Sequence, residues 1–210
     1  MTYAFNLWIY FGLLFGIIIV PGMDMAFVIT NSVTRGQRFG LAATFGIMLG
    51  GAFHTLFGAL AAGALSKFPQ IMVSALLIAG SFYMAWIGWN LLRSSISFHD
   101  SITEDRAALS RVFWQGTVTC LLNPKAYLFV LAVYPQFIRP QYGPIASQAL
   151  VMGSLTVLTQ FAIYGGLALA ASFARQALQQ NPSATQWVGR LAGGLFLGVA
   201  MLTLWTALAR

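Results

Sequence analysis

The sequence predicts an all-α membrane protein with six transmembrane helices, arranged as two inverted three-helix repeats whose first and fourth helices are broken. Three observations predict this fold. Of the 210 residues, 59% are hydrophobic and only 7% are charged, whereas an ordinary soluble domain carries about 25% charged residues. Six apolar segments each supply the ~20 residues that a helix needs to cross the hydrocarbon layer. Proline interrupts two of these segments beside a polar or charged residue.

Composition also excludes several classes of protein. The net charge of +7 would suggest a nucleic-acid partner for a soluble protein. Here most of the eleven basic residues fall in short connections, where they orient membrane helices, so we expect membrane lipids and no nucleic acid. Residues 1–4 have no basic stretch or cleavage site, so the first apolar segment is expected to be a retained helix rather than a signal peptide. The single cysteine, Cys120, cannot form an internal disulfide.

The expected spans follow one another with short connections. Barrel strands are excluded because the apolar runs are too long and show no alternation of polar and apolar residues. Residues 94–111 form the longest connection and are expected to link the repeats 1–93 and 112–210 in the cytoplasm. The predicted spans cover residues 5–32, 40–65, 70–92, 112–137, 145–172 and 188–208.

The two halves resemble each other weakly. Pro21 and Pro124 interrupt the first helix of each half, and the pairs Gly46/Gly58 and Gly153/Gly165 occur in the second helices. Because three is odd, repeats of three helices lie in opposite orientations, as in many transporters with discontinuous helices. Chance resemblance between apolar, glycine-rich segments stays the alternative.

The first interruption is Pro21-Gly22-Met23-Asp24. Proline removes a backbone donor and bends or ends a helix, and the freed backbone groups need partners that lipid cannot supply. Asp24 is the only acidic residue of the sequence that falls inside a predicted span. A charge at this depth costs about 3 kcal/mol or more, so it indicates a functional site.

The second interruption is Asn123-Pro124-Lys125. Asparagine is a favoured N-cap and proline a favoured first helical residue, so a helix is expected to restart here at mid-membrane. Its N-terminus would suit a carboxylate, and Lys125 would add a full positive charge. The two interruptions thus offer complementary groups to an amino acid, and we predict that Pro21, Gly22, Asp24, Asn123, Pro124 and Lys125 form the substrate site. A structural Asp24–Lys125 ion pair is the alternative.

Further polar residues lie within the predicted spans. Asp24 and His54 are candidates for proton coupling, since histidine titrates near neutrality, although a hydrogen-bonded packing role for His54 is equally open. Asn31, Gln160 and Tyr164 are candidates for lining a polar cavity. No metal site, nucleotide loop or catalytic triad is recognisable in the sequence, so we expect no cofactor and no enzyme.

Six short motifs follow one another along the chain in a specific order. They are residues 21–24, Arg35-Gly36-Gln37-Arg38-Phe39-Gly40-Leu41, Gly46-x-x-x-Gly50, Leu122-Asn123-Pro124-Lys125-Ala126, Pro135-Gln136-Phe137 and Gly193-Gly194-Leu195-Phe196-Leu197-Gly198. In these motifs the chain resembles the LysE/RhtB family of bacterial amino-acid exporters, and the resemblance covers essentially its whole length. The family commonly has a second proline where this chain has Met23.

The resemblance implies an exporter of amino acids or close derivatives in the bacterial cytoplasmic membrane, coupled to the proton gradient. We expect alternating access, with the halves rocking around a site between the two interruptions. The solitary Asp24 favours neutral substrates over lysine or arginine, because a cationic side chain would need a second anion. A passive channel is the alternative, and an intramembrane enzyme using His54 and Asp24 lacks a nucleophile. The sequence leaves open whether the protein forms a homodimer.

Overall fold

The structure, a computed structural model, describes two continuous stretches and a set of separate positions. Outside the short connections the described residues are helical, and none of them lies in a strand, which confirms the all-α class for this part of the chain. Most of the predicted spans 70–92 and 188–208 and of the predicted linker lies outside the described residues. The described residues are 2–62, 78, 81–82, 85–86, 88–89, 92–93, 106–179, 187, 190–191, 193–194, 197–198, 200–201 and 204–205.

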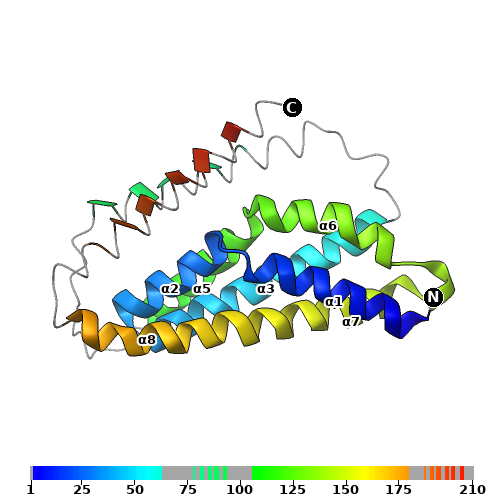
Figure 1. Cartoon of the computed structure of the whole chain (residues 1–210), viewed down its shortest axis with the longest axis horizontal. Coiled ribbons are helices and arrows are strands. Elements are labelled where there is room, and N and C mark those ends of the chain that lie inside the picture. Colours follow the sequence, from blue (N-terminus) through cyan, green and yellow to red (C-terminus); the bar gives the residue numbers. More distant parts are fainter. Residues whose placement is uncertain are drawn as a thin grey trace.

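The first predicted span is two helices, α1 (Tyr3–Ile19) and α2 (Met23–Arg35), which are bent by 53° at their junction. Val20 ends α1 in an extended conformation, as expected of a residue before proline. The predicted break is thus confirmed. Figure 1 shows the step between the two helices.

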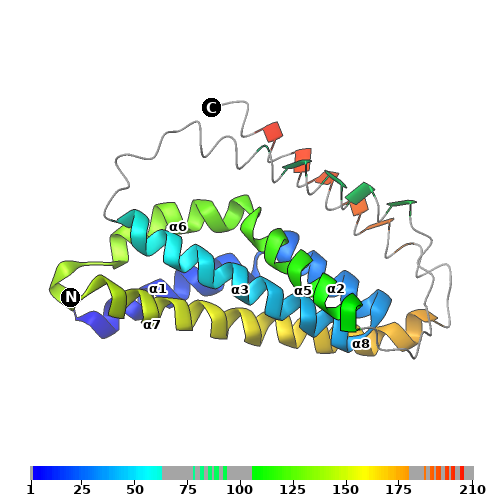
Figure 2. The ribbon, with the colours of Figure 1, turned by 180° about the vertical axis from the view of Figure 1, so that it is seen from behind.

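Helix α3 (Gln37–Ala62) follows α2 after one residue. That residue, Gly36, has a φ of 95°, a left-handed conformation that favours glycine. The segment Gln37–Leu60 is long and apolar enough to cross a membrane. Helix α3 packs against α2, α5, α6, α7 and α8, and therefore forms the centre of the bundle, as Figure 2 shows from behind.

The predicted fourth span is also divided, into α5 (Arg106–Leu121) and α6 (Pro124–Phe137). Asn123 is the N-cap of α6, and its Oδ1 accepts a hydrogen bond of 3.0 Å from the backbone N–H of Lys125. This confirms the expected restart at Asn123-Pro124, because asparagine satisfies a backbone donor that the first turn leaves free.

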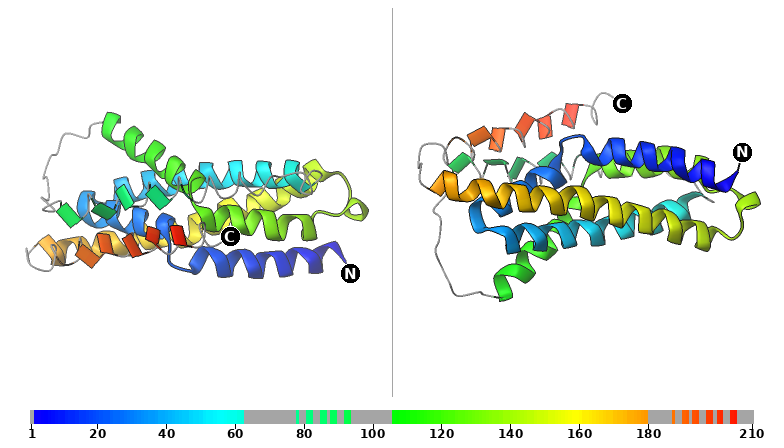
Figure 3. Two further views of the ribbon diagram at one scale, coloured as in Figure 1. Left: turned by 90° about the horizontal axis from the view of Figure 1, so that it is seen from above. Right: turned by 60° about the horizontal axis from the view of Figure 1, so that its bottom comes forward.

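The chain then returns through a short 3-10 turn, η2 (Pro140–Tyr142), into a long rod. The rod consists of α7 (Ile145–Gln160), the π-helical turn η3 (Phe161–Gly165) and α8 (Gly166–Gln179). Its segment Ile145–Ala174 is the second straight span of the described chain, and the bent α1–α2 pair brings the number of candidate spans to three. Both views of Figure 3 show the rod running the length of the bundle.

Helices α3 and α5 approach each other through glycines. A Cβ atom at Gly46 would collide with the Phe113 carbonyl oxygen, and one at Gly116 would lie 2.7 Å from the Ala43 carbonyl oxygen. The Thr117 hydroxyl donates to the Gly46 carbonyl over 3.0 Å. The motif Gly46-x-x-x-Gly50 therefore packs helices within one chain, as small residues do in membrane proteins.

Gly46→Ala is expected to lower the free energy of unfolding of the purified protein by about 1–3 kcal/mol, and with it the melting temperature, because the new methyl group meets backbone that cannot move aside. The matched control is Gly12→Ala in α1, where a Cβ would meet nothing within 4 Å. Thermal unfolding in detergent measures both variants. Equal melting temperatures for the two proteins would contradict the close approach of α3 and α5.

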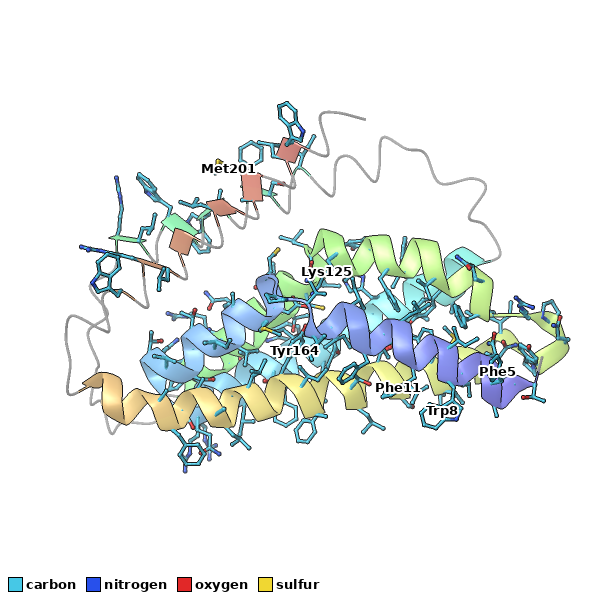
Figure 4. All side chains as sticks on the ribbon, in the orientation of Figure 1. Phe5, Trp8, Phe11, Lys125, Tyr164 and Met201 are labelled. Carbon is cyan, nitrogen blue, oxygen red and sulfur yellow. The ribbon has the colours of Figure 1, made fainter. Side chains whose placement is uncertain are left out.

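Large apolar side chains cover the outside of the bundle. Trp8 in α1 is 71% exposed and Phe173 in α8 is 78% exposed. Phe5, Trp8 and Phe11 follow one another along α1 in Figure 4. Exposed apolar surface of this extent is unfavourable in water and suits lipid chains. The surface therefore agrees with the membrane location that composition predicts.

Candidate functional site

Residues next to both helix breaks line one cavity of about 50 Å³. Leu14 and Ile18 of α1 and Phe129 and Val130 of α6 supply apolar walls. The polar lining comes from α2, α3, α6 with its cap, α7 and η3, which lie far apart in the sequence. Its polar members include Asp24, His54, Asn123, Lys125, Gln160 and Tyr164.

Two side chains satisfy the carbonyl end of α1 at the first break. The Lys125 Nζ donates to the Val20 carbonyl over 2.8 Å, and the Tyr164 hydroxyl donates to the Ile18 carbonyl over 3.4 Å. The last carbonyls of a helix have no partner within it, and a cation there interacts favourably with the helix dipole. Figure 4 shows Lys125 and Tyr164 at the step between α1 and α2. The two halves of the chain are thus joined at the break.

His54 performs the corresponding task at the second break. Its Nε2 donates to the carbonyl of Cys120, near the end of α5, over 2.8 Å. The imidazole also contacts the Tyr127 ring edge-on, with 4.5 Å between the ring centres. This geometry agrees with the hydrogen-bonded packing role for His54, and its part in proton coupling stays a prediction.

Three polar atoms at the cavity have no hydrogen-bond partner although they are buried. They are the Asp24 Oδ1, the Asn123 Nδ2 and the Gln160 Oε1. An unsatisfied buried polar group costs about 1–3 kcal/mol, so three at one cavity need an explanation. Two are acceptors and one is a donor, and the Asn123 amide lies next to the Asp24 carboxylate without forming a bond to its Oδ1. Together with the Lys125 ammonium, these groups would complement a small molecule that carries both charges.

Asp24 and Lys125, which both lie in the described part of the chain, form no direct ion pair with each other. The Lys125 ammonium bonds to the Val20 carbonyl, while the Asp24 Oδ1 is buried without a hydrogen-bond partner. A pair that served only to hold the halves together would bring the charged atoms into contact. The geometry therefore favours a site over a structural clamp.

Not all the residues expected at the site line the cavity. Pro21 is exposed at the break, and Asn31 is buried but donates to the Phe27 carbonyl one turn earlier over 2.9 Å. Gly22 caps α2, and a Cβ there would lie 3.3 Å from the Lys125 Nζ. Pro124 is the first residue of α6. These residues shape the breaks, whereas Asn31 belongs to the packing of α2.

Sequence reasoning missed a hydroxyl network beside the cavity, formed by Tyr10, Thr55, Tyr134 and Thr156. The Tyr134 hydroxyl lies 3.0 Å from the Tyr10 hydroxyl and 2.9 Å from the Thr55 Oγ1. The Tyr10 hydroxyl lies 3.0 Å from the Thr156 Oγ1. Tyr134 and Thr156 also line the cavity. A tyrosine in the middle of an apolar run was the available signal, because its hydroxyl needs a partner in lipid.

An apolar helical bundle that encloses polar groups at two interrupted helices has the architecture of a membrane transport protein. The family of LysE type translocators matches residues 15–206 of the chain. The chain therefore belongs to the LysE type translocator family. No solved structure matches it.

Curated relatives cover nearly the whole chain. A leucine efflux protein of Salmonella typhimurium is 26% identical over 197 residues, which is 93% of this chain and 92% of that protein. Membrane proteins of uncharacterized function from Pseudomonas aeruginosa and Vibrio cholerae are 30% and 28% identical and cover 95% and 88% of this chain, 96% and 89% of their own lengths. The family and the apolar helices identify a multi-pass protein of the bacterial inner membrane.

Proposed function

We propose that this protein exports neutral amino acids from the cytoplasm in exchange for protons, by alternating access around the cavity at the two helix breaks. The observation that carries the proposal is the set of unpartnered atoms of Asp24, Asn123 and Gln160 at that cavity. The efflux function of the Salmonella relative supports the direction of transport.

The substrate carboxylate would bind the Asn123 amide and the Lys125 ammonium, at the N-terminus of α6. Two donors and a helix N-terminus together favour an anion. The substrate ammonium would bind the Asp24 carboxylate, which is 4% exposed. A proton would compete with that ammonium for Asp24, so that one carboxylate couples the two movements.

The apolar part of the lining suits an aliphatic substrate side chain. Leu14, Ile17, Ile18, Phe129 and Val130 line the cavity, and the two charged residues in its lining are Asp24 and Lys125. A zwitterion leaves this pair of charges balanced, whereas a cationic side chain would add a charge without a partner. Leucine and its neutral analogues are therefore the substrates that we propose.

We propose that the chain forms six helices in two inverted repeats and that helices of both repeats move when the site opens. The polar lining of the cavity supports this proposal because it comes from both predicted repeats. Asp24 and His54 belong to the first repeat, and Asn123, Lys125 and Gln160 belong to the second.

The proposal is tested by uptake of labelled amino acids into everted vesicles with and without a proton gradient. Uptake of leucine against its concentration gradient, only when the proton gradient is present, would support the exchanger. Downhill movement alone would identify a passive channel instead, and absence of transport for every amino acid would contradict the proposal.

We expect both termini to lie outside the cytoplasm. The connections that follow the first, third and fifth predicted spans contain seven arginines, and the opposite side contains three basic residues. Positive residues stay in the cytoplasm. Phosphatase and fluorescent-protein fusions after Arg210 report on opposite compartments, and the phosphatase fusion should be the active one. A bright fluorescent fusion would reverse the topology. The seven are Arg35, Arg38, Arg93, Arg106, Arg111, Arg175 and Arg190, and the three are Lys67, Arg139 and Arg210.

A further inference from the structure

Helix α7 contains two buried glutamines that differ in their hydrogen bonds. Gln148, which is 1% exposed, donates to the carbonyls of Arg139 and Gly143 over 2.8 and 2.7 Å and accepts from the Arg139 N–H over 3.0 Å. It holds the connection between α6 and α7. Gln160, which is 5% exposed, leaves its Oε1 without a partner. A role in holding the fold therefore explains every polar atom of the Gln148 side chain, whereas the Gln160 Oε1 is left unexplained.

Local structure directs Gln160 to the cavity. It is the last residue of α7, directly before the π-helical turn η3, and such turns occur frequently at functional sites. On the facing helix α3, a Cβ at Gly51 would collide with the Gln160 Oε1. Glycine at position 51 thus leaves the space in which the amide lies, and both residues line the cavity.

The chemistry of the cavity indicates what this amide binds. The Asn123 Nδ2 and the Lys125 ammonium are donors and suit the substrate carboxylate. The Asp24 Oδ1 and the Gln160 Oε1 are unpartnered acceptors. An ammonium group carries three donors and needs more than one acceptor when it leaves water. A neutral amide supplies an acceptor without adding charge.

We propose that Gln160 binds the substrate ammonium together with Asp24, and that its lack of charge restricts the site to neutral amino acids. This inference rests on the proposed export of amino acids. Because glutamate has nearly the same shape as glutamine, the residue at position 160 would set the charge of the site. Glutamate would supply the partner that a lysine or arginine side chain lacks in the wild-type cavity.

Two substitutions test the two parts of the inference. Gln160→Leu is expected to raise the KM for leucine uptake into everted vesicles about tenfold to a hundredfold, as expected for a lost hydrogen bond to a charged group, with a smaller effect on kcat. Gln160→Glu is expected to gain uptake of labelled lysine and arginine that the wild type does not carry.

Gln148→Leu is the matched control, since it makes the same change on the same helix. It should lower the melting temperature of the protein and leave the KM for leucine unchanged. An unchanged KM in Gln160→Leu would overturn the ammonium contact. A Gln160→Glu protein that carries leucine but no lysine would overturn the selection by charge. If the Gln160→Glu protein does not reach the membrane, the KM of Gln160→Leu alone tests the contact of Gln160 with the substrate ammonium. A wild type that carries no amino acid would refute the proposed function itself.

Discussion

Asp24→Asn is expected to abolish proton-driven accumulation of substrate, while slow exchange of substrate for substrate persists. The amide keeps the size of the side chain and one of its acceptor oxygens. It cannot take up a proton or balance an ammonium group, so the competition that couples the two movements is lost. Because Asp24 is buried and its Oδ1 has no partner, the substitution removes no hydrogen bond of that atom. The effect should therefore fall on transport rather than on folding.

Gradient-driven uptake into everted vesicles, measured beside counterflow without a gradient, separates these effects. The control is Asp105→Asn, the same change in the predicted linker, which should transport like the wild type. If Asp24→Asn still concentrates substrate with the pH dependence of the wild type, Asp24 does not couple transport to protons, and His54 becomes the candidate for that role.

Lys125→Met is expected to lower transport about tenfold to a hundredfold, the range for loss of a hydrogen bond to a charged group. Methionine fills similar space but cannot donate to the Val20 carbonyl or to a carboxylate. The substitution thus removes the cation of the site and also the bond of 2.8 Å that joins the second break to the first. Protein should still reach the membrane, which immunoblotting of membrane fractions measures.

Lys125→Arg is expected to impair transport as well, although it keeps the charge. The 2.8 Å bond from the Lys125 Nζ to the Val20 carbonyl depends on the reach of the lysine side chain, and a longer side chain with a planar guanidinium cannot place its donors in the same position. Arg139→Met serves as the control, because Arg139 is exposed and its Nε donates to the Gln136 carbonyl away from the cavity lining. Full transport by Lys125→Met would refute the binding of carboxylate by Lys125, and activity in Lys125→Arg alone would mean that charge suffices.

The helix breaks could be predicted from the sequence because their causes are local. Proline ends a helix through its own ring, and Asn123 caps α6 by accepting a hydrogen bond from the backbone N–H of Lys125, two residues further on. The polar residues Asp24, Asn123, Lys125, His54, Gln160 and Tyr164 stood out by their cost in lipid, and the structure places them on one cavity.

Contacts between distant segments could not be predicted in the same way. The bond from Lys125 to Val20 joins residues 105 positions apart, and the contact of Tyr10 with Thr156 joins residues 146 apart. Such pairs depend on how helices pack, which no single apolar segment specifies. Asn31 shows the converse, since a polar residue in a span can be satisfied by its own helix.

The close packing of α3 and α5 affects which parts of this protein can move. Helix α3 belongs to the first predicted repeat and α5 to the second, yet their backbones touch at Gly46 and Gly116 without intervening side chains. Separating them would expose closely packed surfaces that lipid or water would have to cover. A rigid scaffold of α3 and α5 would therefore stay fixed during a transport cycle. The half-helices α1 and α6, which meet the breaks at Pro21 and at Asn123, would move against this scaffold. The fixed part and the moving part would then each combine one helix from each predicted repeat.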